Sequence, residues 1–357
     1  MKEEIHQRIK KAINEKVFPG CVFGVSVKGQ RRSIFSEGRF TYEETSHAVS
    51  DNTVYDIASV TKVIPTSLSL LTLIDQGKVC IEDQVVSYIP EFGNSPAKEK
   101  VLIKHLLTYT LNLVIPSMTS MKDFSPEKII ETVVSAELRE EPGTNFLYTN
   151  ATAMLVGLIV RNVTGSSLEE FSRATFFDPL EMNDTTFHPE DSQKENIPPT
   201  EIDEWRGGVV QGVVHDESTY SLKAKCHLGV AGLFSNTPDL LTLLEVILDC
   251  GIKDGTRYFS KEMIENMPVI PFRVSIETPG LGWKFEQPLQ PHLRTLLSDR
   301  TLGQTGFTGC FVLCDQESGV AITMISNRTF PKRPESGKAI SELRSDLVDI
   351  VYRSLDN

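Results

Sequence analysis

Segments with the pattern of β-strands lie at both ends of this 357-residue chain, and segments with the pattern of helices fill its middle. Near the N-terminus, residues 21–27 and 32–40 read as two strands of a hairpin, with Gly29 supplying the turn. Near the C-terminus we expect three further strands, at about residues 296–299, 310–314 and 320–326. Strands and helices that are segregated along a chain favour an α+β fold over a parallel, doubly wound sheet. We therefore predict one antiparallel sheet built from both chain ends.

The predicted helices set the rest of the architecture. They lie at residues 2–16, 103–110, 126–138, 150–163, 168–177, 238–250, 260–267 and 340–355. We expect the two terminal helices to flank the sheet and the middle helices to form a second lobe. The chain would then be a single domain over residues 1–357, with an α/β lobe from about 1–75 and 275–357 and a mainly helical lobe from about 76–274. A cleft between two such lobes is a common place for a site.

The stretch from residue 55 to residue 77 carries the first candidate for chemistry. Ser59 and Lys62 are three residues apart, so on a helix they lie on one face, one above the other. If the helix begins at Ser59, its first N–H groups have no partner within the helix and the positive end of the helix dipole points at the hydroxyl. A nucleophilic serine needs a base within reach and donors for the oxyanion that forms. The alternative is a serine at a helix start followed by a surface lysine. Pro65 predicts a kink, unless the helix starts later than Ser59.

The charge balance narrows the class of partner. The chain has 36 Lys and Arg against 48 Asp and Glu, a formal charge of −12, which is unfavourable for binding nucleic acid or an anionic membrane surface. The first twenty residues are charged and amphipathic and lack the apolar core of a signal peptide. No stretch reaches 18 continuous apolar residues. We therefore expect a cytoplasmic protein with a small-molecule or peptide-like substrate.

The cysteines and histidines do not predict a metal or a cofactor. The six cysteines, at positions 21, 80, 226, 250, 310 and 314, contain no C-x-x-C pair, and free thiols in a reducing compartment are the expectation. The run His215-Asp216-Glu217 suggests a metal site, but three consecutive residues do not easily converge on one ion, so we expect a cluster that pins a loop. Trp205-Arg206, in a long polar loop, would either bind a sugar or carboxylate or anchor the loop.

Two further motifs follow Ser59 in a fixed order. One is Tyr148-Thr149-Asn150 at the start of a predicted helix, and the other is the glycine-rich run 303–309, reading GQTGFTG. With Ser59-x-x-Lys62, these make the sequence resemble the serine β-lactamase and penicillin-binding-protein superfamily, in its class C-like branch, which also holds esterases and peptidases. Residues 103–108, 179–185 and 229–235 extend the resemblance over nearly the whole chain.

The resemblance implies a role for each motif residue. Ser59 would be the acylated nucleophile, and Lys62 would take its proton, for which burial would favour the neutral amine. Tyr148 would relay protons to the leaving group and help to activate water for deacylation. Asn150 would hydrogen-bond the substrate and hold Lys62 in place. The oxyanion hole would be the N–H groups of Ser59 and Phe307.

The third motif also carries a departure from the family pattern. Gln304 and Thr305 would line the side of the cleft along which the substrate extends, and Gly306 would precede the oxyanion-hole residue. The family usually has Lys or His where this chain has the neutral Gln304, and a cation there can attract a substrate carboxylate. Residues 109–112, reading YTLN, replace a His-Thr-Ser-Gly type turn. Both differences disfavour classical penicillin hydrolysis.

The predicted function is a serine hydrolase that cleaves an ester or amide through an acyl-enzyme. Residues 199–207 and 212–217 resemble members that cleave the amide between N-acetylmuramic acid and L-alanine, so a muramyl-L-alanine amidase-like muropeptide hydrolase is one expectation. A carboxylesterase, or a β-lactamase or D,D-peptidase, is the alternative within the superfamily. A penicillin-recognising protein that is acylated but does not turn over is the alternative from another class, and the retention of Tyr148 argues against it.

Overall fold

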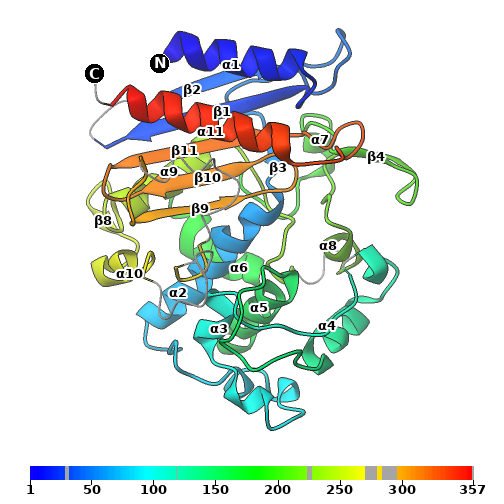
Figure 1. Ribbon diagram of the computed structural model, residues 1–357, viewed down its shortest axis with the longest axis vertical. Helices are drawn as coiled ribbons and strands as arrows, with labels where there is room; N and C mark the ends of the chain where they lie inside the picture. Colours follow the sequence, from blue (N-terminus) through cyan, green and yellow to red (C-terminus); the bar gives the residue numbers. More distant parts are fainter. Residues whose placement is uncertain (29–31, 118, 223–226, 270–279, 284–295, 356–357) are drawn as a thin grey trace.

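The computed structural model describes residues 1–28, 32–117, 119–222, 227–269, 280–283 and 296–355. Its main sheet has five antiparallel strands in the order β2-β1-β11-β10-β9 (Figure 1). These are β1 (Gly20–Val27), β2 (Ser33–Gly38), β9 (Thr301–Thr305), β10 (Phe311–Asp315) and β11 (Val320–Ser326). The predicted α+β fold with one antiparallel sheet from both chain ends is therefore confirmed. The predicted hairpin turn at Gly29 lies outside the described residues.

Alternation along the strands gives the sheet two apolar faces. Phe23 and Val25 of β1 face one core, together with Phe311 of β10 and Met324 of β11. Val22, next to Phe23 on β1, faces the other core. The register pairs Phe23 with Met324 and Gly24 with Thr323, which keeps the two sets of side chains apart across the sheet. Both faces must therefore be covered by helices.

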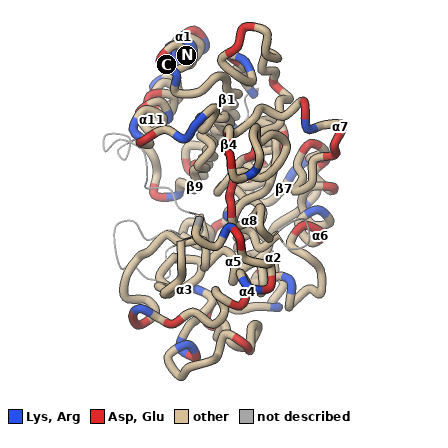
Figure 2. The backbone as a smooth tube through the Cα atoms, turned by 90° about the vertical axis from the view of Figure 1, so that its right-hand side faces the viewer, with Lys and Arg blue, Asp and Glu red and all other residues tan. Residues whose placement is uncertain are grey.

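The two terminal helices cover the first face. Helix α1 (Lys2–Asn14) buries Ile5, Ile9 and Ala12, and α11 (Lys338–Arg353) buries a similar stripe that includes Leu343 and Leu347. The two helices lie side by side, with both chain termini at the same end of the molecule (Figures 1 and 2). An ion pair between Arg8 and Asp346, 2.7 Å apart, links them.

Helix α9 (Thr237–Leu248) covers the second face of the sheet. An added Cβ at Gly24 would lie 2.4 Å from Thr237 Cγ2, so glycine is what lets this helix approach β1 closely. Arg32 Nε also donates to Glu245 Oε1 over 2.6 Å, which ties α9 to the start of β2. The expected division placed this helix in the helical lobe, because sequence distance alone put it in the middle of the chain; in the structure it packs against the sheet.

The helical lobe is built around α5 (Asn150–Thr164), whose residues 151–160 are all buried. The Thr149 side chain caps its first turn, and Gly165, with φ of 71°, ends it. The helices packed around it are α2 (Leu68–Asp75), α3 (Ile103–Leu107), α4 (Pro126–Ser135) and α6 (Leu168–Ser172), the last continuing as a wider turn over Arg173–Phe177.

The remaining described elements are short. The short helices are α7 (Asp191–Lys194), α8 (Glu217–Leu222) and α10 (Lys261–Asn266). Three two-stranded pairs are β3 (Tyr55–Asp56) with β6 (Phe234–Ser235), β4 (Glu201–Asp203) with β5 (Gly208–Val210), and β7 (Ile252–Lys253) with β8 (Thr256–Arg257). Five 3-10 turns lie at Ala58–Lys62, Val85–Ser87, Pro90–Phe92, Lys98–Lys100 and Thr119–Met121. Within the described residues, no single helix is long and apolar enough to span a membrane, and the one pair of helices that qualifies jointly is bent by 75°.

The strand predicted at residues 296–299 is wrong. This segment forms a turn, and the edge strand is the following one, β9. The turn is held by Asp315 at the end of β10, whose carboxylate accepts hydrogen bonds from the hydroxyl and the N–H of Ser298. Leu302 and Gly303 then pair with Cys314 and Leu313.

Candidate active site

Ser59 lies on a tight turn between the sheet and the helical lobe. The turn begins after β3, forms a 3-10 helix over Ala58–Lys62, and is interrupted at Ile64, whose φ of −117° and ψ of 105° are not helical. Of the two possibilities left open for Ser59, an α-helix beginning there does not form. The extended conformation favoured before Pro65 interrupts the turn at Ile64, and α2 begins only at Leu68. A turn this short adds little macrodipole, so the activation of Ser59 depends on its side-chain neighbours.

The neighbour that matters most is Lys62. Its Nζ lies 2.9 Å from Ser59 Oγ, and the lysine side chain is 1% exposed while Ser59 remains partly accessible. The same Nζ donates to the carbonyl oxygen of Val230 over 3.0 Å. Sequence reasoning assigned the task of holding Lys62 to Asn150. In the structure Asn150 is the first residue of α5, and the hydrogen-bond partners of the Lys62 amine among the described residues are Ser59 and Val230.

Tyr148 completes the group around the amine. Its ring faces Lys62 Nζ, which is 5.4 Å from the ring centroid, and its hydroxyl accepts a hydrogen bond from Gln304 Nε2 over 3.1 Å. The ring of Tyr109 packs against that of Tyr148 at 5.1 Å, and burial raises the pKa of the Tyr109 hydroxyl well above its usual value, with the neighbouring Tyr148 adding to the effect. Tyr109 therefore stays uncharged, and its ring holds the ring of Tyr148 in place by packing against it.

The glycine-rich run brings the end of β9 against the Ser59 turn. The hydroxyl of Thr308 donates to the carbonyl oxygen of Asp56 over 2.8 Å, and a Cβ placed on Gly306 would lie only 2.5 Å from the carbonyl oxygen of Ile57. Ser59 is the second residue of its 3-10 helix, a position whose N–H has no partner within the helix, and Phe307 lies in the turn that follows β9. The two predicted oxyanion-hole residues are therefore on directly packed segments.

The side chain of Asp56 helps to hold the Ser59 turn in place. Its carboxylate accepts hydrogen bonds from the N–H of Ala58 over 2.8 Å and from the N–H of His215 over 2.7 Å. Burial raises the pKa of Asp56, although the two backbone donors oppose the rise. One buried side chain thus joins the nucleophile turn to the loop that carries His215.

A pocket of about 320 Å³ opens over the nucleophile. It is lined by Ser59, Tyr148, the predicted residues Gln304, Thr305, Gly306 and Phe307, and by Arg328, Gly337, Ile340 and Arg344. Arg344 is buried and donates to the carbonyl oxygens of Gly306 and Cys310. Arg328 donates through Nε to the carbonyl oxygen of Phe307 and stacks on its ring at 5.2 Å. Arg328 therefore supplies a positive charge at the rim of the pocket that motif reasoning had not placed there.

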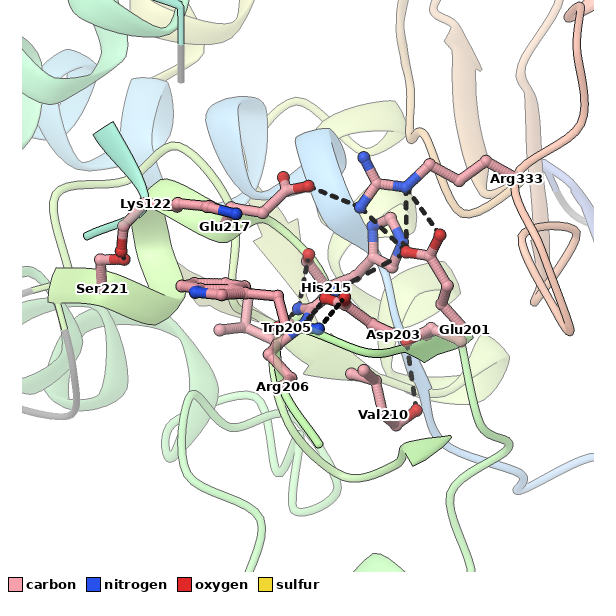
Figure 3. Close-up of polar contacts among 12 residues, drawn as sticks. Lys122, Glu201, Asp203, Trp205, Arg206, Val210, His215, Glu217, Ser221 and Arg333 are labelled. Carbon is pink, nitrogen blue, oxygen red and sulfur yellow. Dashed lines mark hydrogen bonds and ion pairs between the residues drawn. The ribbon is translucent and has the colours of Figure 1, made fainter. Parts of the chain in front are cut away.

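A cluster of charged side chains adjoins the pocket behind Phe307, whose ring stacks on that of His215 at 5.7 Å. Figure 3 shows His215, Glu201 and Arg333 converging, and Figure 2 shows acidic and basic segments together around β4. His215 Nε2 lies 2.9 Å from Glu201 Oε2, and Arg333 pairs with both Glu201 and Glu217. Burial raises the pKa of Glu201, but the hydrogen bonds from His215 and Arg333 outweigh it and hold the pKa below its usual value.

This cluster resolves two alternatives left open by the sequence. Arg206 is nearly buried, donates to Asp203 over 2.6 Å, and donates to the carbonyl oxygens of Val214 and His215. Arg206 therefore anchors its loop. His215 and Glu217 pair with Glu201 and Arg333, respectively, which fits the expected pinning of a loop.

Sequence reasoning missed Val230, Asp56 and Arg328. Val230 acts through its carbonyl oxygen, which leaves no trace in the residue type. Asp56 stands at the start of the stretch around Ser59, and an acidic residue in an apolar strand was a usable signal. Arg328 follows the predicted strand Val320–Ser326 by two residues, so its place at the edge of the sheet near the pocket was within reach of the pattern.

Chemically, the arrangement places a partly accessible hydroxyl in hydrogen-bond contact with a buried amine, and the ring of a phenol against that amine, beside an open pocket. An amine at 2.9 Å is within the range for taking the proton of an attacking hydroxyl, and Ser59 and Phe307, whose N–H groups are predicted to bind the oxyanion, line the same pocket. These are the components of acyl transfer to serine.

Comparison with known proteins agrees with this chemistry. The Beta-lactamase family matches residues 5–344. A putative D-alanyl-D-alanine carboxypeptidase of Escherichia coli K12 is 30% identical over 340 residues, covering 85% of this chain and 77% of the relative, and its namesake in Salmonella typhi is 31% identical over 310 residues, covering 78% and 70%.

Solved structures show the same fold at lower identity. EstCE1, a hydrolase with promiscuous acyltransferase activity, matches with a TM-score of 0.75 at 19% identity, covering 96% of this chain and 98% of its own. A beta-lactamase/D-alanine carboxypeptidase from Pseudomonas syringae matches with a TM-score of 0.77 at 16% identity, covering 98% of both chains. A class C beta-lactamase has a TM-score of 0.76 at 19% identity, with 98% and 97% covered. Sequence, fold and site thus agree that the chain belongs to the Beta-lactamase family and is a serine hydrolase.

Proposed function

We propose that the enzyme acts through an acyl-enzyme on Ser59, with Lys62 as the base. The supporting observation is the contact of 2.9 Å between Lys62 Nζ and Ser59 Oγ beside the pocket. Lys62 Nζ takes the hydroxyl proton as Oγ attacks the carbonyl carbon of the substrate. The N–H groups of Ser59 and Phe307 stabilise the resulting oxyanion, and the intermediate collapses with loss of the amine or alcohol.

Tyr148 serves the two proton transfers that remain. Its hydroxyl is held by Gln304, and its ring packs on Tyr109 and faces Lys62 Nζ. It passes a proton to the leaving group during acylation and takes one from the attacking water during deacylation. This second transfer distinguishes a hydrolase from a protein that traps its acyl group.

For the substrate we propose the amide bond of a muropeptide, between a muramyl lactyl group and L-alanine. The support is that residues 199–207 and 212–217, which carry the resemblance to muropeptide hydrolases, fold into the charged cluster directly behind Phe307. Hydrolysis of D-alanyl-D-alanine peptides, the activity named for the curated relatives, is the second candidate. In either case a peptide-like substrate places its acyl group in the pocket over Ser59.

The charges of the side chains that line the pocket are relevant to whether the enzyme accepts β-lactams as substrates. Gln304 is 4% exposed, and its amide nitrogen is used by Tyr148 and by the carbonyl oxygen of Thr305. It offers no positive charge to a substrate carboxylate. Of the two arginines that line the pocket, Arg344 is buried and donates to backbone carbonyl oxygens, so we assign the charge that meets a substrate to Arg328 at the rim. We propose that this displaced charge favours longer, peptide-like substrates over compact bicyclic ones.

The test is a substrate panel comparing kcat/KM for a muramyl-L-alanyl peptide, a D-alanyl-D-alanine peptide, short-chain p-nitrophenyl esters and nitrocefin. Preference for the muramyl peptide supports the proposal, and preference for the D-alanyl peptide or butyrate ester replaces it by the carboxypeptidase or esterase. If nitrocefin is the best substrate, the enzyme is a β-lactamase and the interpretation of Gln304 is wrong. A stoichiometric burst without turnover on every member would indicate acylation alone.

A further inference from the structure

Three side chains of metal-ligand type, from separate segments, meet at His227, close in sequence to Val230, whose carbonyl oxygen holds Lys62. They are Glu169 in α6, His188 after the bridge between Thr186 and Phe234, and His227 before Leu228. Their ligand atoms all lie within 4.8 Å of one another. His188 Nε2 is 2.9 Å from Glu169 Oε2 and 3.3 Å from His227 Nε2.

Hydrogen bonds among these three side chains do not meet the hydrogen-bonding capacity of all three. Both contacts use the same atom, His188 Nε2, which carries at most one hydrogen. If His188 Nε2 donates that hydrogen to Glu169, it can at best share the same hydrogen with the lone pair of His227 Nε2. A cation between the three atoms would instead accept a lone pair from each of them.

The geometry points to a binding site for a divalent transition-metal ion, and we propose that Glu169, His188 and His227 bind Zn²⁺. Two imidazoles with one carboxylate form a known zinc ligand set, and the usual bond lengths place neighbouring ligand atoms of a tetrahedral site about 3.3–3.4 Å apart. Two of the three separations, 2.9 and 3.3 Å, are close to this value, and the third, between Glu169 and His227, lies within 4.8 Å. The side chain of His188 is 40% exposed, which leaves room for water as the fourth ligand. Imidazole nitrogens disfavour Ca²⁺ and Mg²⁺, which prefer oxygen.

Each ligand is fixed by its own surroundings. The ring of Phe187 stacks on His227 with centroids 4.4 Å apart. The N–H of His188 donates to the hydroxyl of Thr186 over 3.0 Å. Glu169 lies in the first turn of α6, where Ser167 and Glu170 form a capping box. The site is therefore largely formed by the fold before any ion binds.

The position of the site gives the ion a structural consequence. His227 precedes two carbonyl oxygens that hold the residues of and after the Ser59 turn: that of Gly229 accepts from Thr66 Oγ1 over 2.8 Å, and that of Val230 accepts from Lys62 Nζ. An ion on His227 would link this segment to α6 and to the segment containing His188. It would thereby stabilise the position of the carbonyl oxygen that orients the amine.

The test is a Zn²⁺ titration of the untagged full chain by isothermal calorimetry, after dialysis against a chelator. We expect a single site in the wild type and a higher melting temperature in the presence of Zn²⁺. His188→Ala and Glu169→Gln should each weaken binding at least roughly tenfold, since loss of even an outer partner of a ligand costs about 10–100-fold. Both side chains are partly exposed, and a melt without metal verifies that each variant is folded.

The matched control is His6→Ala. His6 also pairs with a carboxylate, Glu37, at 2.6 Å, but within the described residues only the Glu169 group has three donors in reach of one ion. The control should bind Zn²⁺ like the wild type. Absence of a single site in the wild type, or equal affinity in the wild type and both ligand variants, would overturn the proposal. The readout is metal affinity, so it is independent of which substrate the enzyme cleaves.

Discussion

Replacing Gly306 with alanine tests whether close packing of β9 on the nucleophile turn is what forms the oxyanion hole. The new Cβ would lie 2.5 Å from the carbonyl oxygen of Ile57 and 3.4 Å from the Cβ of Ala58. Ordinary contact begins at 3.4 Å, so the two segments must separate by about 0.9 Å locally. The obstacle is backbone and cannot rotate away. The N–H groups of Ser59 and Phe307, one on each segment, must then move apart.

The magnitude follows from two known sensitivities. Overpacking a tight contact costs about 1–3 kcal/mol of stability, and a misplacement of about 1 Å at a reacting centre can cost on the order of 100-fold in rate. We therefore expect Gly306→Ala to remain folded with a lowered melting temperature, and to lose roughly 100-fold in kcat. The KM should change much less, because the oxyanion forms only after the substrate has bound.

The assay is hydrolysis of a p-nitrophenyl ester, with thermal unfolding of the same preparations. Gly337→Ala is the matched control: it lines the same pocket, and an added Cβ there meets nothing within 4 Å. A change within about 0.5 kcal/mol in stability and a small effect on rate are expected for it. If Gly306→Ala turns over like the wild type, the N–H of Phe307 is not part of the oxyanion hole, and the reasoning from this contact is refuted.

Three further predictions concern the residues around Ser59 and a buried histidine of the helical lobe. Lys62→Met and Tyr148→Phe should each lower kcat by roughly 10²–10⁴ with folding intact, the usual share of acid–base catalysis; near-wild-type turnover in either variant would remove that residue from the mechanism. Gln304→Lys should raise kcat/KM for nitrocefin about tenfold or more, because a charge-assisted hydrogen bond contributes about 1.5–3 kcal/mol, and an unchanged value would contradict the role given to Gln304. Burial lowers the pKa of His105 from 6.5 to about 4, with the nearby Lys104 adding to the effect, so the folded state favours the neutral ring; the stability it contributes is present above pH 6.5 and is lost as pH falls toward 4. His105→Asn, which keeps an acceptor for the N–H of Leu102, should melt with a weaker pH dependence in that window, and identical slopes would show that His105 does not control it.

The extent to which sequence predicted the fold depended on how local the signal was. Strands β10 and β11 were predicted within a residue, since each is a continuous apolar run ended by turn residues. The edge strand β9 was misplaced because its sequence, TLGQT, has little apolar pattern, while the residues before it, LLSD, have more. What fixes β9 is pairing with β10 and the bond from Ser298 to Asp315, both of which are tertiary.

The candidate site divides in the same way. Ser59, Lys62 and Tyr148 belong to short motifs with a characteristic order, so the sequence could name them, and the fold brings them together. The carbonyl oxygen of Val230, 168 residues from Lys62, has no such signal. The proposed metal ligands were missed for the same reason: Glu169, His188 and His227 are separated by 19 and 39 residues, with no ligand spacing to read.

The most direct test of the central claim is to locate the covalent adduct formed with a fluorophosphonate. Intact and peptide mass spectrometry should find a single modification on Ser59. It should be absent in Ser59→Ala and form much more slowly in Lys62→Met, because the contact of 2.9 Å between the amine and the hydroxyl is lost. A modification on another residue, or equal rates in the wild type and Lys62→Met, would contradict the account of Ser59 as a nucleophile activated by Lys62.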